Sequence, residues 1–535
     1  MTISINQLLR NVQRFTKRSL FITGHLPLVF TLASHSVYAQ NYNDKPVLNI
    51  SSFDITGDNP IGDKAFEVLK PYLGHQGIEG LSVASSALEQ AIKSEGFGFH
   101  RVNLPPQTLN KGMVTLQIIR FNIGNINVND NKFFNEKNIL KSIPLLIEGE
   151  SPNTTKLSQS IKFANQHPDK NITVEFTRGA GNNEIDSNIH VIEKSPQTTF
   201  LSVENTGSVE AESLRATIGY QHSNLFNKDH NLILTFTTTP EDTGSAQQYG
   251  LRYRIPIYSQ STNISFLIAE SESSTGTLAD DSLITGKGSL KSFEYTHQLD
   301  SRDFFEHKVV LGLSHKLFDN ELFGINRKVL SMPIKTGYRF SNTQVKTSFS
   351  GDIDLTLNIP SGQFNDADAY ELARTGAENS WWAGHYDFSW RYSFSNSWQF
   401  ISSIHGQISN ELLIPGEQFG LGGLRTLRGF EERSINGDEG YRYKFELWTA
   451  DIHFTGFKYV LFYDSAHIKK YETSSILNDG FEIDLKSAGL GIRWNWEQSA
   501  SLKLDYGSIL KGGGADNSVN QDGDNKLHFS IVYKF

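Results

Sequence analysis

The length, composition and charge of the chain exclude several classes of protein. The chain has 535 residues, no cysteine and a net charge of −9. The lack of cysteine excludes disulfides, thiolate nucleophiles and cysteine-ligated metals, and the acidic balance gives no electrostatic support to nucleic-acid binding. Aromatic residues make up 12% of the chain, yet beyond residue 39 no apolar run is long enough for a transmembrane helix. This combination favours a β-barrel with aromatic girdles and a large soluble all-β protein equally.

Residues 1–39 have the pattern of an export signal peptide. Basic residues come first, a mostly apolar stretch follows at 20–33, and Ala39 ends a small-residue cleavage site before Gln40. The alternative is a retained amphipathic helix over residues 7–15. We predict export, which also matches the absence of thiols, because stray thiols are a hazard in oxidising compartments. The exact cleavage position stays open.

The segment 46–120 is predicted to be a small α/β module with the order strand, helix, helix, strand, strand. The first helix opens at Asp58, which we expect to be its N-cap, with Pro60 in the first turn. The second helix ends before Gly96, a residue that favours helix C-termini. The predicted strands span residues 47–55, 97–104 and 113–120, and the second helix spans residues 82–94.

The segment 121–195 is predicted to repeat that order. Its elements span residues 124–128, 134–143, 154–165, 172–177 and 185–193. Two consecutive modules of about 75 residues constitute an internal repeat. The order of elements resembles that of POTRA domains, the periplasmic modules of outer-membrane assembly and secretion proteins.

From about residue 198 to residue 535 apolar and polar residues alternate. One face of each strand is therefore apolar or aromatic, and the other is polar. The alternation continues for nine residues or more, as at 248–257, 345–357 and 385–394, whereas strands of soluble sheets usually have about 5–6 residues and transmembrane strands about 9–11. Because lipid cannot satisfy an open sheet edge, we predict a closed antiparallel barrel of about 16 strands with a polar lumen.

The end of the chain supports a membrane barrel. Apolar residues alternate to the terminal Phe535, and a C-terminal aromatic residue on such a strand resembles the insertion signal of bacterial outer-membrane proteins. The alternative is a soluble strand that ends in phenylalanine by chance.

A glycine-rich stretch at 417–441 interrupts the alternation. It contains the tetrapeptide Leu427, Arg428, Gly429 and Phe430, and upstream of it lie Glu417, Gln418, Phe419, Gly422 and Gly423. A second motif follows at Phe462, Asp464 and Ala466. With two POTRA-like modules before a barrel, these motifs resemble the TpsB transporters of two-partner secretion, the haemolysin secretion/activation family within the wider POTRA-barrel assembly superfamily.

The resemblance implies a specific contact. Residues 411–440 are expected to be an extracellular loop that folds back into the lumen, where Arg428 pairs with Asp464 on the barrel wall and the other motif residues support the loop. A guanidinium can bind a carboxylate through two hydrogen bonds. The alternative is that both charges are unpaired and solvated. The family motif has glycine where this chain has Ala466. Some members of the family also carry an N-terminal helix that plugs the barrel. Cleavage after Ala39 would leave only about seven residues before the first module, too few for such a helix.

The resemblance also implies a function. We expect an outer-membrane translocator whose periplasmic modules recognise an unfolded cognate exoprotein, a TpsA protein, and whose barrel secretes and thereby activates it. It would be a monomer in outer-membrane lipid, without cofactor, metal, nucleic acid or catalytic residues. The alternatives are an assembly factor that inserts other barrels, a porin or nutrient receptor, and a hydrolase. The sequence leaves open whether the partner is a haemolysin, an adhesin, a contact-dependent toxin or a haem-acquisition protein.

Overall fold

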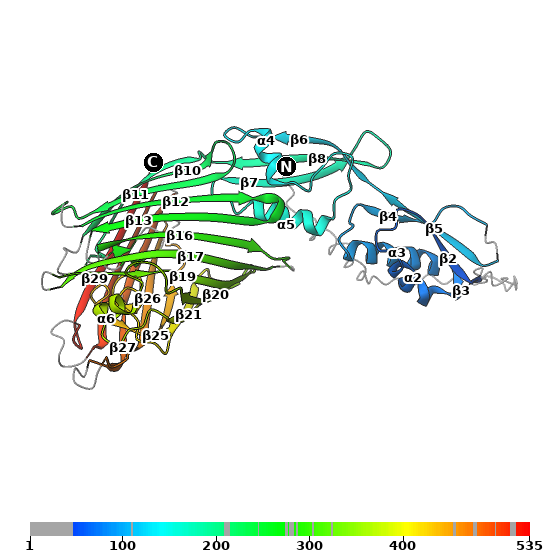
Figure 1. Ribbon diagram of the computed structural model, residues 1–535. Helices are drawn as coiled ribbons and strands as arrows, with labels where there is room; N and C mark the ends of the chain where they lie inside the picture. The colour runs from blue at the N-terminus through cyan, green and yellow to red at the C-terminus, as the bar shows by residue number, and fades with distance from the viewer. Residues whose placement is uncertain are drawn as a thin grey trace, which may run out of the picture.

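The structure is a computed structural model in which two small α/β modules precede a β-barrel (Figure 1). It describes residues 47–108, 111–207, 214–243, 246–272, 276–277, 283–284, 287–301, 304–322, 325–452, 456–473, 479–497, 499–513 and 520–535. The predicted signal peptide at 1–39 lies outside the described residues.

The first module consists of a three-stranded sheet, a two-stranded sheet and two helices. Its elements are β1 (Val47–Ile50), β2 (Ser52–Gly57), α2 (Lys64–Leu69), the 3-10 turn η1 (Lys70–Tyr72), β3 (Gly74–Gly77), α3 (Ile78–Ser94), β4 (His100–Asn103) and β5 (Met113–Arg120). The larger sheet has the order β2-β5-β4, with β2 parallel and β4 antiparallel to β5. One face of α3, with Leu88 and Ile92, is buried against Val114 and Leu116 of β5 and forms the core of the module.

Two predictions in the first module are wrong. The predicted strand 47–55 is two strands, because the chain breaks at Ser51, whose backbone N–H donates to the loop before β5. This break lets β1 pair with β3 while β2 pairs with β5. Asp58 does not cap the first helix, which begins at Lys64. The carboxylate of Asp58 instead forms an ion pair with the guanidinium of Arg120 at the end of β5, at 3.1 Å.

The second module repeats the order of the first without the β1–β3 pair, and the five elements predicted for it are all present. They are β6 (Asn122–Asn129), α4 (Glu136–Ser142), α5 (Thr154–Ala164), β7 (Lys170–Arg178) and β8 (Glu184–Glu193). The sheet order β6-β8-β7, with β6 parallel and β7 antiparallel to β8, matches that of the first module. Both helices are N-capped by asparagine, Asn135 and Asn153, whose side-chain oxygens accept backbone N–H groups of the first turn.

The rest of the chain forms a closed antiparallel barrel. Its strands are β9 (Gln197–Glu204), β10 (Arg215–Leu225), β11 (His230–Thr238), β12 (Gln247–Ile257), β13 (Thr262–Glu272), β16 (Lys287–Gln298), β17 (Phe305–Leu322), β18 (Ile325–Ser331), β19 (Pro333–Thr343), β20 (Thr347–Asn358), β21 (Trp382–Ser393), β22 (Gln399–Ile408), β25 (Glu439–Trp448), β26 (Phe457–Lys470), β27 (Phe481–Trp496), β28 (Ala500–Lys511) and β29 (Asn525–Lys534). The last strand, β29, pairs with β9 and closes the barrel.

The barrel has 16 strands over the described ranges, as predicted. Although 17 segments are labelled, β18 and β19 are separated only by Met332. Both pair with β17 in one unbroken register, Lys316 opposite Ser331 and Leu313 opposite Ile334. They are therefore one barrel strand, and the count is even, as single-chain bacterial barrels require.

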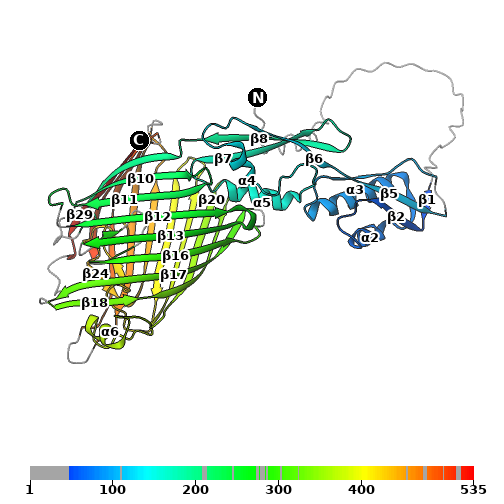
Figure 2. The same ribbon diagram turned by 45° about the horizontal axis from the view of Figure 1, so that its top comes forward.

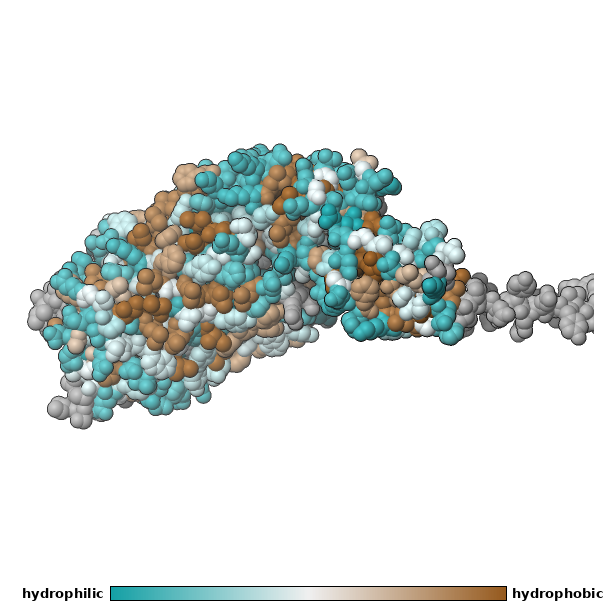
Figure 3. All heavy atoms as spheres, turned by 45° about the vertical axis from the view of Figure 1, so that its right-hand side comes forward, coloured by the Kyte–Doolittle hydropathy of each residue, from teal (hydrophilic) through white to brown (hydrophobic). Residues whose placement is uncertain are grey.

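The outer face of the barrel is apolar. Large side chains at alternate positions point outward and are exposed, for example Ile353, Leu355 and Leu357 of β20, and Figure 3 shows brown side chains gathered on this face. Asp352 and Asp354 of the same strand belong to the opposite, polar face. This outside-apolar pattern is that of a barrel in lipid. Among the described residues no helix is long and apolar enough to cross a membrane.

The modules extend from one end of the barrel, the end reached by the short turns between strands (Figure 2). The connections at the opposite end are longer. One carries helix α6 (Ala367–Ala373) between β20 and β21. Another, residues 409–438 between β22 and β25, contains the short strands β23 (Phe419–Leu421) and β24 (Ile435–Gly437). The sequence predicts residues 411–440 for this loop, so the observed loop begins and ends two residues earlier in the chain.

Candidate functional site

The loop 409–438, here called the lumen loop, packs against the inner wall of the barrel. Its strands β23 and β24 form a small hairpin, and its apolar residues join wall residues in one buried cluster. The cluster contains Phe419, Leu421, Leu427, Phe430, Ile435, Ala466, Ile468, Leu485 and Ile509. Burial of this many apolar side chains, each stabilising by about 1.5–3 kcal/mol, fixes the loop to the wall formed by β26, β27 and β28.

The structure brings Arg428 and Asp464 into direct contact. The Nε atom of Arg428 donates to Oδ2 of Asp464 at 2.8 Å and Nη2 donates to Oδ1 at 2.6 Å. The backbone N–H of Arg428 donates to the same carboxylate at 3.2 Å. Arg428 is 2% exposed and Asp464 is fully buried. The alternative of two solvated charges does not describe this site.

The second sequence motif forms the floor of this contact. Phe462, Asp464 and Ala466 occupy alternate positions of β26, so all three face the lumen. The guanidinium carbon of Arg428 lies 3.6 Å from the centre of the Phe462 ring, a cation–π contact. Ala466 is buried in the apolar cluster beneath the loop. At this position β26 is a regular strand, so alanine fits where the family motif has glycine.

Three charged wall residues complete the site, and the sequence did not single them out. Glu446 on β25 accepts a hydrogen bond from Nη1 of Arg428 at 2.6 Å. Arg493 on β27 and Asp505 on β28 form a two-pronged ion pair at 2.7 and 2.9 Å, and Asp505 lies 3.7 Å from Arg428. These residues occupy polar positions of alternating strands, but one sequence cannot show which of many such charges the loop meets.

Gly429 brings the loop backbone against the barrel wall. Its φ is +92°, a value that L side chains rarely adopt, and a Cβ there would lie 3.2 Å from the backbone of Gly507 on β28. The backbone N–H of Gly429 donates to Nε2 of the buried His528 on β29 at 2.9 Å. The turn after Arg428 therefore requires a residue without a side chain.

The predicted support residues are spread along the loop. Glu417 forms an ion pair with Lys316 of β17 at 2.7 Å, so it anchors the loop to the opposite wall. Gln418 donates to Asp438 at 3.2 Å, and Phe419 stacks on His405 of β22 with ring centres 5.7 Å apart.

The paired glycines shape the turn before the tetrapeptide. Gly422 and Gly423 have φ values of +111° and +97°. The N–H of Gly423 donates to the carbonyl of Leu427 at 3.1 Å, and the N–H of Arg433 donates to that of Gly422 at 3.3 Å. These bonds hold the loop in a compact turn.

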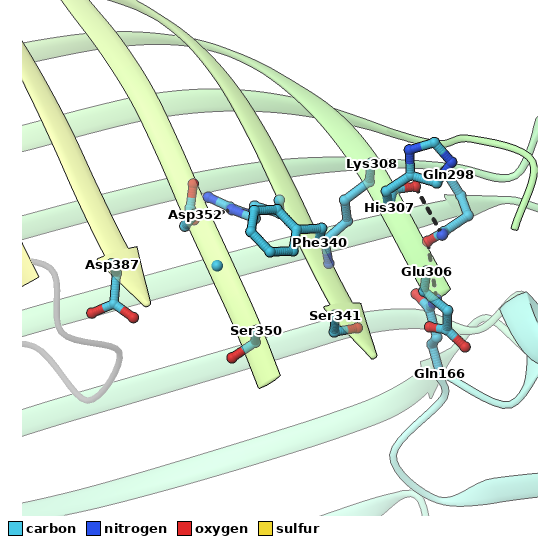
Figure 4. A pocket seen from close by; sticks show the side chains of 12 residues that line it. Gln166, Gln298, Glu306, His307, Lys308, Phe340, Ser341, Ser350, Asp352 and Asp387 are labelled. Carbon is cyan, nitrogen blue, oxygen red and sulfur yellow. Dashed lines mark hydrogen bonds and ion pairs between the residues drawn. The ribbon is translucent and has the colours of Figure 1, made fainter. Parts of the chain in front are cut away.

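Open space remains on the side of the lumen away from the Arg428 contact. A cavity of about 620 Å³ lies between the lumen loop and the wall, bounded by loop residues such as Arg425 and Glu432 and by Arg252, Glu294 and His385 of the wall. A second cavity of about 290 Å³ lies at the end of β17, β19 and β20 near the second module (Figure 4). Its lining carries charges of both signs. The lining residues include Gln166 of the second module, Glu306, Lys308, Asp352 and Asp387.

A buried polar cluster joins the second module to the barrel. The ammonium group of Lys170, 2% exposed, donates to Asp229 in the β10–β11 turn at 2.6 Å and to Asn138 of α4 at 2.8 Å. Tyr258, in the β12–β13 turn, donates to the same carboxylate at 2.6 Å and packs in the core of the module. We call Asn138, Ser142, His167, Lys170, Asp229 and Tyr258 the module joint.

Comparison with known proteins places the chain in a family. The model of the haemolysin secretion/activation protein ShlB/FhaC/HecB matches residues 183–494, and that of the ShlB-type POTRA domain matches residues 48–120. The heme/hemopexin transporter protein HuxB of Haemophilus influenzae is 20% identical over 541 residues, which cover 95% of this chain and 91% of HuxB. The outer membrane transporter CdiB of Dickeya dadantii is 22% identical over 383 residues, 66% of this chain and 64% of CdiB.

A solved structure agrees with these relatives. CdiB from Escherichia coli superposes with a TM-score of 0.75 at 16% identity, covering 99% of this chain and 97% of that one. The first family model spans more than half of the chain, and a POTRA module precedes a closed barrel with an apolar exterior. The chain therefore belongs to the haemolysin secretion/activation family, the TpsB outer-membrane transporters of two-partner secretion, with its POTRA modules in the periplasm.

Proposed function

We propose that this chain recognises one unfolded exoprotein in the periplasm and secretes it through the barrel, which allows the exoprotein to fold and become active outside. The observation that carries the proposal is the lumen loop, which lies inside a polar channel and whose Arg428 is bound to the barrel wall by one compact set of charged contacts. A loop held in this way can close the lumen at rest and move as a unit when a polypeptide enters.

The two modules supply a surface for capture. Within the described ranges, the β6-β8-β7 sheet has two strands with an unpaired edge, and an extended chain can add to such an edge by main-chain hydrogen bonds. Gln166 of the second module also lines the cavity at the barrel end. An exoprotein bound to this module therefore lies next to the channel.

The direction of transport needs no nucleotide in this account. Folding of the exoprotein outside the cell removes it from the unfolded pool, and this bias is sufficient to draw further chain through the barrel. The chemical class of the exoprotein stays open among haemolysin, adhesin, contact-dependent toxin and haem-acquisition protein. A protein encoded beside this gene is the first candidate.

The test compares secretion with and without this chain. The candidate exoprotein is measured in the medium and in the periplasm of cells that express or lack the transporter, and the amounts of several unrelated outer-membrane barrels are measured in the same cells. We expect the exoprotein in the medium only when the transporter is present, with the other barrels unchanged. An indifferent exoprotein together with a general loss of barrels would overturn the proposal in favour of a barrel-assembly factor.

A further inference from the structure

A second cluster of buried polar contacts holds the lumen loop at its outer end, and its centre is Asp438. This carboxylate is fully buried. It accepts hydrogen bonds from the backbone N–H of Leu413 at 2.9 Å, from Gln418 at 3.2 Å and from the backbone N–H of Tyr471 at 2.7 Å. Both Nη atoms of Arg374 donate hydrogen bonds to this carboxylate, and one of these bonds is 2.9 Å long. Every one of these donors compensates part of the cost of burying the charge.

The partners of Asp438 come from three different loops at the end of the barrel opposite the modules. Arg374 follows α6 in the connection between β20 and β21, Leu413 and Gln418 belong to the lumen loop, and Tyr471 begins the connection between β26 and β27. Arg374 also donates to the carbonyls of Leu413 at 2.8 Å and Tyr471 at 2.7 Å. One ion pair therefore ties three loops together.

Apolar packing places Arg374 for this contact. Tyr370 of α6 and Trp381 are buried together with Leu413 and Ile414 of the lumen loop. The hydroxyl oxygen of Tyr370 accepts the indole N–H of Trp381 at 3.2 Å. The connection between β20 and β21, residues 359–381, therefore packs over the start of the lumen loop, and we call it the cap.

This cluster is separate from the contact around Arg428. Among the described residues, the hydrogen-bond and ion-pair partners of Asp438 and Arg374 include none of those of Arg428, which are Glu446, Asp464 and Asp505. The two clusters therefore hold the lumen loop in the middle of the lumen and at the outer mouth, in addition to its ion pairs with Lys316, Glu204 and Lys526. Release of one contact leaves the other in place.

We propose that Arg374 and Asp438 form an outer latch that closes the exit of the channel and must open for the exoprotein to leave. Because the latch joins three loops, its opening frees the cap around α6 and the base of the lumen loop together. Both are positioning residues, since they act on the loops and need not touch the exoprotein. The inference rests on the proposed function for its biological role, but the state of the latch can be measured without any exoprotein.

The test removes the ion pair without burying a lone charge. The double variant Arg374→Gln and Asp438→Asn keeps hydrogen-bonding groups of similar size and avoids the uncompensated buried charge that a single substitution would create. The full-length variant is expected to reach the outer membrane in normal amounts. In planar bilayers the purified protein should spend more time in an open, ion-conducting state than the wild type.

A cysteine reporter gives a second measurement, because the natural chain has no cysteine. Ser409 is fully buried at the base of the lumen loop, and its carbonyl accepts the hydroxyl of Tyr471 at 2.9 Å. In a Ser409→Cys background, a membrane-impermeant maleimide added to whole cells should react on the order of tenfold faster when the latch pair is removed. A Ser361→Cys reporter, on an exposed residue of the cap, should react at one rate in both backgrounds.

The matched control is Glu378→Gln, which removes an exposed charge from the same connection as Arg374 and should change neither conductance nor labelling. Equal labelling of Ser409→Cys and equal conductance with and without the latch pair would overturn the latch. If the double variant is not inserted, Arg374→Lys, which keeps the charge and loses the fork, is measured in the same way and must show the same direction of change. Failure of secretion by the wild type would count against the proposed function and leave these two measurements valid.

Discussion

At the scale of single residues, the shape of the arginine side chain matters as much as its charge. Arg428 uses Nε, Nη1, Nη2 and its ring-stacking face at once, toward Asp464, Glu446 and Phe462. Lysine supplies one point charge and cannot make this set of contacts. The site therefore distinguishes between two residues that substitution tables treat as similar.

We expect Arg428→Lys to lower secretion of the exoprotein strongly, nearly as far as Arg428→Ala does, while the barrel is still inserted. Arg428→Ala removes one partner from a buried ion pair, which costs about 3–5 kcal/mol, and Arg428→Lys keeps the charge but loses the fork that binds Asp464 and Glu446. Secretion is measured in the medium, and insertion by the heat-dependent mobility of the folded barrel. Lys511→Gln, at an exposed ion pair, is the control. Full secretion by both Arg428 variants would remove the loop contact from the mechanism.

The sequence predicted the pair Arg428 and Asp464 but not the three wall charges that surround it. Arg428 and Asp464 were paired on the strength of a family resemblance, and the structure places them together. Glu446, Arg493 and Asp505 are lumen-facing charges like many others, and only the three-dimensional register of β25, β27 and β28 brings them to Arg428. The importance of Arg374 could not be seen, because its partner lies 64 residues away.

At the scale of elements, hydrophobic alternation predicted most strands, and Gly96 marked the end of α3. Prediction failed where a local pattern was overridden by a distant partner. Alternation gave one strand over 47–55, but pairing with β3 and β5 splits it at Ser51. Asp58 resembled a cap in sequence, but Arg120, 62 residues away, takes its carboxylate. The module joint was missed for the same reason, since Lys170 and Asp229 are far apart in the chain.

Removal of the charge of Asp229 should loosen the second module from the barrel. Asp229→Asn leaves the ammonium group of Lys170 buried without a counter-charge, which costs about 3–5 kcal/mol. We expect faster protease cleavage between module and barrel in the purified protein, with normal barrel mobility. The double variant Lys170→Met and Asp229→Asn should recover much of the wild-type resistance. Equal cleavage of wild type and Asp229→Asn would show that the joint does not hold the module.

The module joint should also weaken in mild acid. Burial outweighs the attraction of Asp229 and lowers the pKa of His167 below its usual value of 6.5. The neutral ring fits its surroundings, because Nε2 donates to the carbonyl of Ser223 at 2.8 Å and Nδ1 accepts the N–H of Asp169 at 3.2 Å. Since the folded pKa is the lower one, acidification below 6.5 protonates the unfolded form first, and stability falls as pH falls.

A second group acts in the same direction at lower pH. Burial alone would raise the pKa of Asp229, but Lys170 and His167 together with hydrogen bonds lower it below 3.8. Its contribution is complete above that value and is lost as pH falls further. Between about pH 7.5 and about pH 5.5, above the range in which Asp229 titrates, protease cleavage at the joint should therefore accelerate as His167 takes up a proton. His167→Gln should flatten this dependence, and an unchanged pH profile in that variant would contradict the assignment.

At the scale of the whole molecule, the fold separates the modules, which we propose recognise the exoprotein, from the loops at the opposite end of the barrel. The modules lie at one end of the barrel, and α6, which directly precedes Arg374, lies at the other (Figure 2). In the function proposed above, an exoprotein would meet the modules, the cavity near Gln166 and the loop in that order. The sequence predicted this arrangement of modules and barrel, because the repeat and the long alternation are properties of whole segments and do not depend on single contacts.

Deletion of residues 46–195 should abolish secretion and leave the barrel in the membrane. The barrel closes on itself through β9 and β29, so its strand pairing does not need the modules. Secretion and heat-dependent mobility are measured on the same cells, with residues 1–45 retained. Normal secretion by the deleted protein would refute capture by the modules.

The most direct measurement reconstitutes transport from pure components. The purified chain is inserted into lipid vesicles with its modules outside, denatured exoprotein is added, and protection of the exoprotein from external protease is followed. The account predicts protection with the wild-type chain, and little or none with empty vesicles, with the module-deleted chain or with Arg428→Ala. Equal protection in the module-deleted vesicles, or none in the wild-type vesicles when the exoprotein is shown to be intact and unfolded, would contradict a translocator that captures and conducts its partner by itself.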